Sequence, residues 1–255
     1  MHPGSIKRPD FIIIGAQKCG TSSLFYKLNE HPGILLPKSK ELHFFDEHFS
    51  RGLDWYLSFF TQRRPAESFI AGEASPYYFF HPLVPVRIFQ TFPGIKLVLL
   101  LRSPVDRAYS QYQHMKREGR IPLTFEHCIN LESEILGGRK EAFFKDENHS
   151  DLLYRRFSFL ARSRYAEQLT AWYACFSREQ ILIIRSEDFF SDPGKIFQVV
   201  FHFLGLPSHP VELTKKEKYP VYPPMKPETR QKLANYFEPC NRQLCELTGR
   251  DFGWT

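Results

Sequence analysis

A glycine-bounded turn that carries a lysine and three consecutive hydroxyl residues follows an apolar run near the start of the chain. Residues 15–23 read GAQKCGTSS. They match the phosphate-loop pattern G-x-x-x-x-G-K-[ST], except that Thr21 takes the lysine position and the nearest lysine is Lys18. A loop between a buried strand and a helix gathers backbone N–H groups at the positive end of the helix dipole, so this stretch predicts an anion site. The alternative is a strand-to-helix turn capped by hydroxyls.

A second candidate anion site follows the apolar run KLVLLL. Arg102 comes directly after this run, and Ser110 lies eight residues later, about two helical turns on. A guanidinium and a hydroxyl on one face could hold a phosphate together. Arginine at this strand end disfavours hydrolysis of a magnesium nucleotide, because that chemistry needs a carboxylate to hold the metal. The sequence therefore favours a nucleotide with a second anionic group, bound without metal. The alternative is a structural ion pair between Arg102 and Asp106.

The elements that must position these residues alternate between strands and helices. Four apolar runs predict buried parallel strands, at Phe11–Gly15, 69–72, Lys96–Leu101 and 180–184. Helical patterns cover 22–30, 83–91, 103–117, 162–176 and 226–247, and residues 137–151 are expected to form a surface loop. A capping box from Ser103 to Asp106 and a helix start at Asp192-Pro193 are also expected. The pattern predicts an α/β fold with a central, mainly parallel sheet flanked by helices, and ligands at the carboxyl ends of the strands.

The composition limits the class of protein. The chain has 255 residues, of which 42% are hydrophobic, and we expect one domain over residues 1–255 with a flexible or cloning-derived start at 1–8. A net charge of +6 favours a nucleotide partner, and no nucleic-acid-binding signature is present. Five cysteines without a CxxC pair favour a reducing compartment. Since the sequence has no 18-residue apolar span or signal peptide, we expect a soluble cytoplasmic protein, or a lumenal one if an anchor was removed. A domain cut from a larger polypeptide is the alternative to a complete chain.

Several motifs together resemble one enzyme family. GAQKCGTSSL, KELHFFD and LRSPVDRAYSQY are similar to the 5′-phosphosulfate loop, the catalytic segment and the 3′-phosphate motif of sulfotransferases. The resemblance is closest to heparan sulfate 3-O- and N-sulfotransferase domains and their bacterial relatives. It continues through GLDWYLSFF, GEASPYYF, SRYAEQL, SEDFFSDP and GRDFGW. It implies 3′-phosphoadenosine 5′-phosphosulfate as the donor, adenosine 3′,5′-bisphosphate as the product, and in-line sulfuryl transfer without a metal.

The resemblance also implies which residues bind the donor. Arg102 and Ser110 would hold the 3′-phosphate. Lys18 would stabilise the charge that develops on the leaving phosphate. A late loop closes over the donor in relatives, and Lys216 and Lys218 are the candidates for it here, although the glycine of that loop is missing. The 5′-phosphosulfate would lie against Lys18, Cys19, Gly20, Thr21, Ser22 and Ser23.

The resemblance assigns the acceptor side of the reaction to other residues. Glu41 matches the general base of the heparan enzymes, and we expect apolar neighbours to raise its pKa. His43 is the competing base or a positioning donor, on the same face of an extended segment. Glu73 and Tyr77 are expected to contact the acceptor. The segment 73–76 reads EASP and lacks the lysine of the 3-O-sulfotransferases, which disfavours heparan-like acceptors. For each of these side chains, the alternative to a functional role is a structural one, in packing or in an ion pair.

Three functions remain open at the level of sequence. The first is a sulfotransferase that acts on a hydroxyl or amine of a saccharide, a glycolipid, or a carrier-bound polyketide or lipid-like chain. The second is a P-loop kinase or NTPase, which the displaced lysine and Arg102 disfavour. The third is a non-catalytic nucleotide-binding module, which the presence of Glu41 disfavours.

Overall fold

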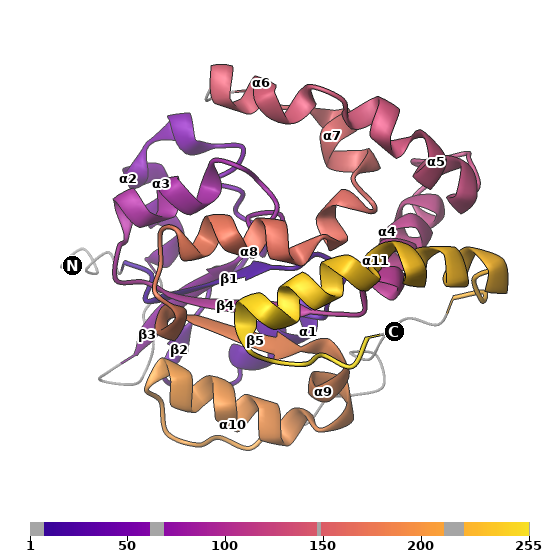
Figure 1. Cartoon of the computed structure of the whole chain (residues 1–255). Coiled ribbons are helices and arrows are strands. Elements are labelled where there is room, and N and C mark those ends of the chain that lie inside the picture. Colours follow the sequence, from indigo (N-terminus) through magenta and orange to yellow (C-terminus); the bar gives the residue numbers. More distant parts are fainter. Residues whose placement is uncertain (1–7, 62–68, 147–148, 212–221, 255) are drawn as a thin grey trace. The chain divides into compact units, whose positions relative to one another are not determined.

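A computed structural model describes residues 8–61, 69–146, 149–211 and 222–254 (Figure 1). The described residues fall into two compact units. The first unit lies within Met1–Leu101 and Cys175–Tyr219, and the second within Arg102–Ala174 and Pro220–Thr255. Each unit is described by itself below.

The described part of the first unit contains a five-stranded parallel sheet with strand order β2-β3-β1-β4-β5. The α/β prediction is therefore confirmed, and the four predicted strands match to within two residues. A short edge strand, β2, was not predicted from the sequence. All five residues of β1 are buried, as expected for a strand covered on both faces. The strands are β1 (Phe11–Gly15), β2 (Ile34–Leu35), β3 (Ile70–Ala74), β4 (Lys96–Leu101) and β5 (Ile181–Arg185).

Helices of the first unit lie on both faces of this sheet (Figure 1). Helix α10 begins after Asp192, whose side chain accepts a hydrogen bond from the Lys195 N–H, and Pro193 takes its first position. The helix start predicted there is confirmed, and Gly205 ends the helix in the left-handed conformation that suits glycine. The helices are α1 (Thr21–Leu28), α2 (Leu53–Leu57), α3 (Val84–Thr91), α9 (Ser186–Ser191) and α10 (Pro193–Leu204).

The second unit is helical in its described residues and has a core of its own. That core gathers Phe125, Phe159, Leu233 and Phe237, each at most 3% exposed, from segments far apart in the sequence. The helices are α4 (Pro104–Arg117), α5 (Phe125–Leu136), α6 (Arg139–Lys145), α7 (Leu152–Phe157), α8 (Tyr165–Tyr173) and α11 (Pro227–Thr248).

Two predictions for the second unit were wrong. Residues 137–151 are not only a surface loop, because α6 lies within them and buries Phe143, whose ring packs against Tyr154. The polar composition of the segment hid this single apolar anchor. Helix α4 begins after Ser103 with Pro104 at its first position, as expected, but the Ser103 side chain makes no capping hydrogen bond.

Among the described residues, no helix combines the length and the apolar character needed to cross a lipid bilayer.

Candidate active site

The loop after β1 is shaped by two glycines that other residues could not replace without movement. A Cβ atom on Gly15 would lie 2.6 Å from the Phe79 Cβ atom. Gly20 has φ of 97°, and a Cβ atom there would lie 2.9 Å from the Phe190 ring. A hydrogen bond from the segment after β5 also fixes the loop, since the Ser186 hydroxyl donates to the Cys19 carbonyl oxygen at 2.6 Å. The packing of neighbouring segments therefore determines the conformation of this loop.

Helix α1 opens directly from this loop. Its N-cap residue is Gly20, which has no side chain to satisfy the first backbone N–H groups of the helix. Thr21 is buried, and Ser22 is exposed at the same turn. No acidic residue lies in this first turn. The strand-loop-helix arrangement is the one that the sequence pattern predicted, and anion binding at this helix N-terminus stays a prediction.

Three candidate catalytic residues share an uncommon backbone conformation. Lys18, Glu41 and His43 have φ of 72°, 64° and 52°, and they are the non-glycine residues with positive φ in the described part of the chain. Side chains other than glycine, asparagine and aspartate seldom adopt this conformation, and it tends to gather at functional sites. The backbone conformation of these three residues therefore indicates a functional site, and this indication does not depend on the sequence motifs.

The segment that carries Glu41 is anchored to the end of β3. The Glu41 N–H donates to the Ala74 carbonyl oxygen at 2.9 Å, and Ala74 is paired with Ile13 of β1. The His43 N–H donates to the Ser75 hydroxyl at 3.3 Å. The strands β1 and β3 are parallel neighbours, so their carboxyl ends lie on the same side of the sheet. The segment with Glu41 is therefore fixed at the side from which the Gly15 loop departs.

His43 lies between two carboxylates. Its Nε2 atom is 3.4 Å from a Glu41 oxygen, and its Nδ1 atom is 2.7 Å from the Asp46 Oδ2 atom. The Asp46 side chain is fully buried, whereas that of Glu41 is 39% exposed. Sequence reasoning missed Asp46, because residues three apart face opposite sides of the extended segment that was expected there. Asp46 fixes the imidazole ring and leaves the Glu41 carboxylate accessible.

The expectation that apolar neighbours raise the Glu41 pKa was wrong. Burial does favour the protonated form, but the hydrogen bond with His43 and the charge and hydrogen bond of Lys40 outweigh it. Together they lower the pKa of Glu41 to about 2. Glu41 is therefore a carboxylate at neutral pH that can accept a hydrogen bond from an acceptor hydroxyl, and a pKa of about 2 makes it a weaker base than a carboxylate tuned near neutral pH.

Glu73 is connected by hydrogen bonds to the segment that carries Glu41. Its carboxylate accepts hydrogen bonds from the hydroxyls of Tyr78 at 2.9 Å, Ser75 at 2.8 Å and Tyr56 at 3.1 Å. The Tyr78 hydroxyl in turn accepts the backbone N–H groups of Phe44 and Phe45. Burial raises the pKa of Glu73 to about 7, against the effect of these hydrogen bonds. Glu73 is 1% exposed, so these contacts give it a supporting role, and contact with the acceptor stays a prediction.

The structure describes Tyr77, but it does not describe the two lysines expected in the loop that closes over the donor. Tyr77 is 5% exposed, and its ring lies 6.0 Å from that of Phe80 and 5.8 Å from that of His81. Its contact with an acceptor stays a prediction. Lys216 and Lys218 lie outside the described residues.

The residues expected at the 3′-phosphate begin the second unit. Arg102 is partly buried, and its carbonyl oxygen accepts a hydrogen bond from the Tyr165 hydroxyl at 3.0 Å. Ser110 is 2% exposed, with its hydroxyl 3.3 Å from that of Tyr222. Asp106, the alternative partner of Arg102, pairs with Arg230 at 2.8 Å. Ser110 therefore has a defined neighbour, and its contact with a phosphate stays a prediction.

One group of side chains near the site has the composition of a metal site. His43, Asp46 and Glu47 each offer one ligand atom, and these atoms lie within 4.8 Å of one another. A metal ion bound there would have to replace the 2.7 Å hydrogen bond between His43 and Asp46. The expected absence of a metal stays a prediction.

The fold and this site define an α/β protein with a glycine-bounded loop after its first strand, and with a carboxylate and an imidazole on a segment bonded to the end of the neighbouring strand β3. A model of the sulfotransferase domain matches residues 8–243. The chain therefore belongs to the sulfotransferase family.

Individual relatives agree with this assignment. The chain is 31% identical to the membrane-associated sulfotransferase kil1 of Dictyostelium discoideum, over 96% of this chain and 66% of that protein. It is 30% identical to mouse heparan sulfate glucosamine 3-O-sulfotransferase 3A1, over 100% of this chain and 66% of that protein. The chain thus spans slightly less than two thirds of these relatives. A solved sulfotransferase from Alicyclobacillus acidocaldarius superposes with a TM-score of 0.79 at 32% identity, over 96% of this chain and 98% of that one.

Proposed function

We propose that this protein transfers a sulfuryl group from 3′-phosphoadenosine 5′-phosphosulfate to a hydroxyl or amine of an acceptor. The observation that carries the proposal is the positive φ of Lys18, Glu41 and His43, in segments attached to the neighbouring strands β1 and β3. Backbone strain at these three positions supports a role for their side chains in the reaction. Family membership supports the donor, and the acceptor remains a saccharide, glycolipid or carrier-bound chain.

In the proposed reaction, Glu41 removes the proton of the acceptor while the acceptor atom bonds to sulfur. The bond between sulfur and the bridging oxygen of the donor breaks, and the electron pair stays on the 5′-phosphate of adenosine 3′,5′-bisphosphate. The first turn of α1 and Lys18 stabilise the charge that develops there. His43, held by Asp46, orients the Glu41 carboxylate or the acceptor. The motif around Arg102 and Ser110 supports their binding of the 3′-phosphate.

Calorimetry separates this function from a P-loop kinase or NTPase. We expect adenosine 3′,5′-bisphosphate to bind with EDTA present, and more tightly than ATP with Mg²⁺. Tighter binding of ATP with Mg²⁺ would favour the NTPase. A non-catalytic module is excluded if the protein transfers sulfate and Glu41→Gln stops the transfer while it retains the affinity for adenosine 3′,5′-bisphosphate.

A further inference from the structure

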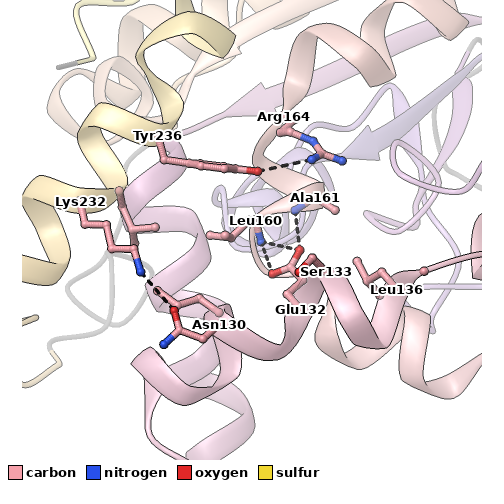
Figure 2. Close-up of a pocket in the computed structure, with 12 residues that line it drawn as sticks. Asn130, Glu132, Ser133, Leu136, Leu160, Ala161, Arg164, Lys232 and Tyr236 are labelled. Atoms are coloured by element: carbon pink, nitrogen blue, oxygen red, sulfur yellow. Dashed lines mark hydrogen bonds between the residues drawn. The ribbon is translucent and has the colours of Figure 1, made fainter.

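A cavity of about 450 Å³ lies within the second unit, apart from the residues assigned to the reaction. Its walls come from α5, α11 and the turn before α8 (Figure 2). The volume is in the range of sites that bind small molecules, roughly 300–1,000 Å³. None of the donor or acceptor residues named above lines this cavity.

One wall of the cavity is apolar. Ile129, Leu160 and Leu233 line it, and the same side chains belong to or pack against the hydrophobic core of the second unit. Glu132 fixes α5 to the turn, because its carboxylate accepts the N–H groups of Leu160 and Ala161 at 2.7–3.0 Å (Figure 2). Both carboxylate oxygens of Glu132 accept these hydrogen bonds, so Glu132 has a structural role in the wall of the cavity.

The two cations at the rim differ in their surroundings. Arg164 lies 3.0 Å from a Glu167 oxygen and donates to the Tyr236 hydroxyl at 3.4 Å. Lys232 donates to the Asn130 Oδ1 atom at 3.1 Å, and within the described ranges no carboxylate lies within 4.0 Å of it. Figure 2 shows Lys232 and Asn130 meeting at one side of the cavity. Since the Asn130 oxygen accepts from Lys232, its amide nitrogen is a further donor at the same place.

We propose that this cavity binds an amphipathic monoanion, with its hydrocarbon body on Ile129, Leu160 and Leu233 and its anionic head on Lys232 and Asn130. The apolar wall removes hydrocarbon from water, and Lys232, which has no carboxylate partner among the described residues, provides the charge for the head. A carboxylate and a sulfate head share this chemistry. The site is independent of the proposed sulfuryl transfer.

The test is calorimetric titration of the full chain at pH 7.5 with octyl sulfate, octanoate and octanol, each below its micelle concentration. We expect saturable binding of one or both anions and at least about tenfold weaker binding of octanol. Which anion binds more tightly identifies the head group. Lys232→Met retains the alkyl stem and should weaken anion binding about fivefold, the scale of one partly exposed ion pair. Ser133→Trp, on the cavity wall, should abolish binding.

The controls separate this proposal from the function proposed above. Gln231→Met changes the neighbouring exposed residue of α11, outside the cavity, and should bind the anions as the wild type does. All variants should retain the wild-type circular dichroism and affinity for adenosine 3′,5′-bisphosphate. Octanol binding as tight as that of the anions, unchanged binding in Ser133→Trp or Lys232→Met, or no saturable binding of either anion would overturn the proposal. Failure of the wild type to bind adenosine 3′,5′-bisphosphate would instead count against the sulfotransferase function.

Discussion

Lys18, Glu41 and His43 occupy backbone positions that glycine would fill more easily. A positive φ costs a residue with a Cβ atom of order 1 kcal/mol or more, and the surrounding hydrogen bonds must compensate. For Glu41 and His43 these bonds come from Ala74 and Ser75. The presence of a charged or ionisable side chain at all three strained positions is best explained by the chemistry of the side chains.

The first prediction concerns the protonation of Glu41. We expect its carboxyl ¹³C signal to titrate well below pH 4, because His43 and Lys40 lower its pKa to about 2. Lys40→Met should move the midpoint upward. The same depressed pKa stabilises the folded chain above the unfolded value of 4.5, and this contribution is lost as the pH falls toward 2. A midpoint near pH 6 in the wild type would contradict the geometry of the site.

The second prediction concerns the donor loop. Gly20→Ala places a Cβ atom 2.9 Å from the Phe190 ring at φ of 97°, so the loop must move. We expect the affinity for adenosine 3′,5′-bisphosphate to fall about tenfold or more, with a loss of roughly 1–3 kcal/mol in the free energy of unfolding. Gly94→Ala is the matched control, since a Cβ atom there meets nothing within 4 Å. Equal donor-product affinity in both variants would remove the loop from the binding site.

At the scale of elements, the end of β3 positions the segment that carries Glu41 and His43. Tyr78 connects the two, since its hydroxyl donates to Glu73 and accepts from Phe44 and Phe45. Tyr78→Phe leaves two backbone N–H groups without this acceptor. We expect the free energy of unfolding to fall by about 1–3 kcal/mol.

The activity of the same variant tests whether Tyr78 positions the site. We expect kcat to fall at least about fivefold, because small displacements of a catalytic group are costly, while donor-product affinity stays within about twofold. Tyr26→Phe, on the exposed face of α1, should change neither quantity. A Tyr78→Phe enzyme that is destabilised but retains its full kcat would show that Tyr78 has a purely structural role.

The sequence predicted the elements whose signals are local. The buried strands β1, β3, β4 and β5 are short apolar runs between turn residues, and α10 has its own cap and proline. Contacts between distant segments left no such signal. The bonds from Tyr78 to Phe44 and Phe45 join residues more than thirty positions apart, and no spacing rule connects them. The Glu41 pKa was mispredicted for a related reason, because the geometry of Lys40 and His43 around its carboxylate decides it.

At the scale of the whole molecule, each unit contains a buried carboxyl that links stability to pH. Burial raises the pKa of both Glu73 and Glu132 to about 7, from a value of 4.5. The folded chain therefore binds these protons more tightly than the unfolded chain between pH 4.5 and 7. The contribution of each of these carboxyls to the free energy of unfolding should fall as the pH rises through this window, by up to about 3 kcal/mol.

Urea unfolding at pH 5 and pH 8 tests this linkage. Glu73→Gln and Glu132→Gln should each reduce the difference in unfolding free energy between the two pH values. Glu134→Gln, an exposed neighbour on α5, should leave the difference unchanged. If neither Gln variant reduces the difference between pH 5 and pH 8, the result would contradict the raised pKa values.

The most direct test of the central claim is transfer of ³⁵S from labelled 3′-phosphoadenosine 5′-phosphosulfate to a panel of saccharide, glycolipid and carrier-bound acceptors, with EDTA present. The account predicts a labelled acceptor with the wild type and undiminished transfer in EDTA. It predicts a loss of about 10²–10⁴-fold with Glu41→Gln, which should still bind adenosine 3′,5′-bisphosphate. Glu47→Gln, an exposed neighbour in the same segment, should transfer sulfate normally. Full transfer by Glu41→Gln, or transfer that stops in EDTA and returns with a divalent metal, would contradict the account.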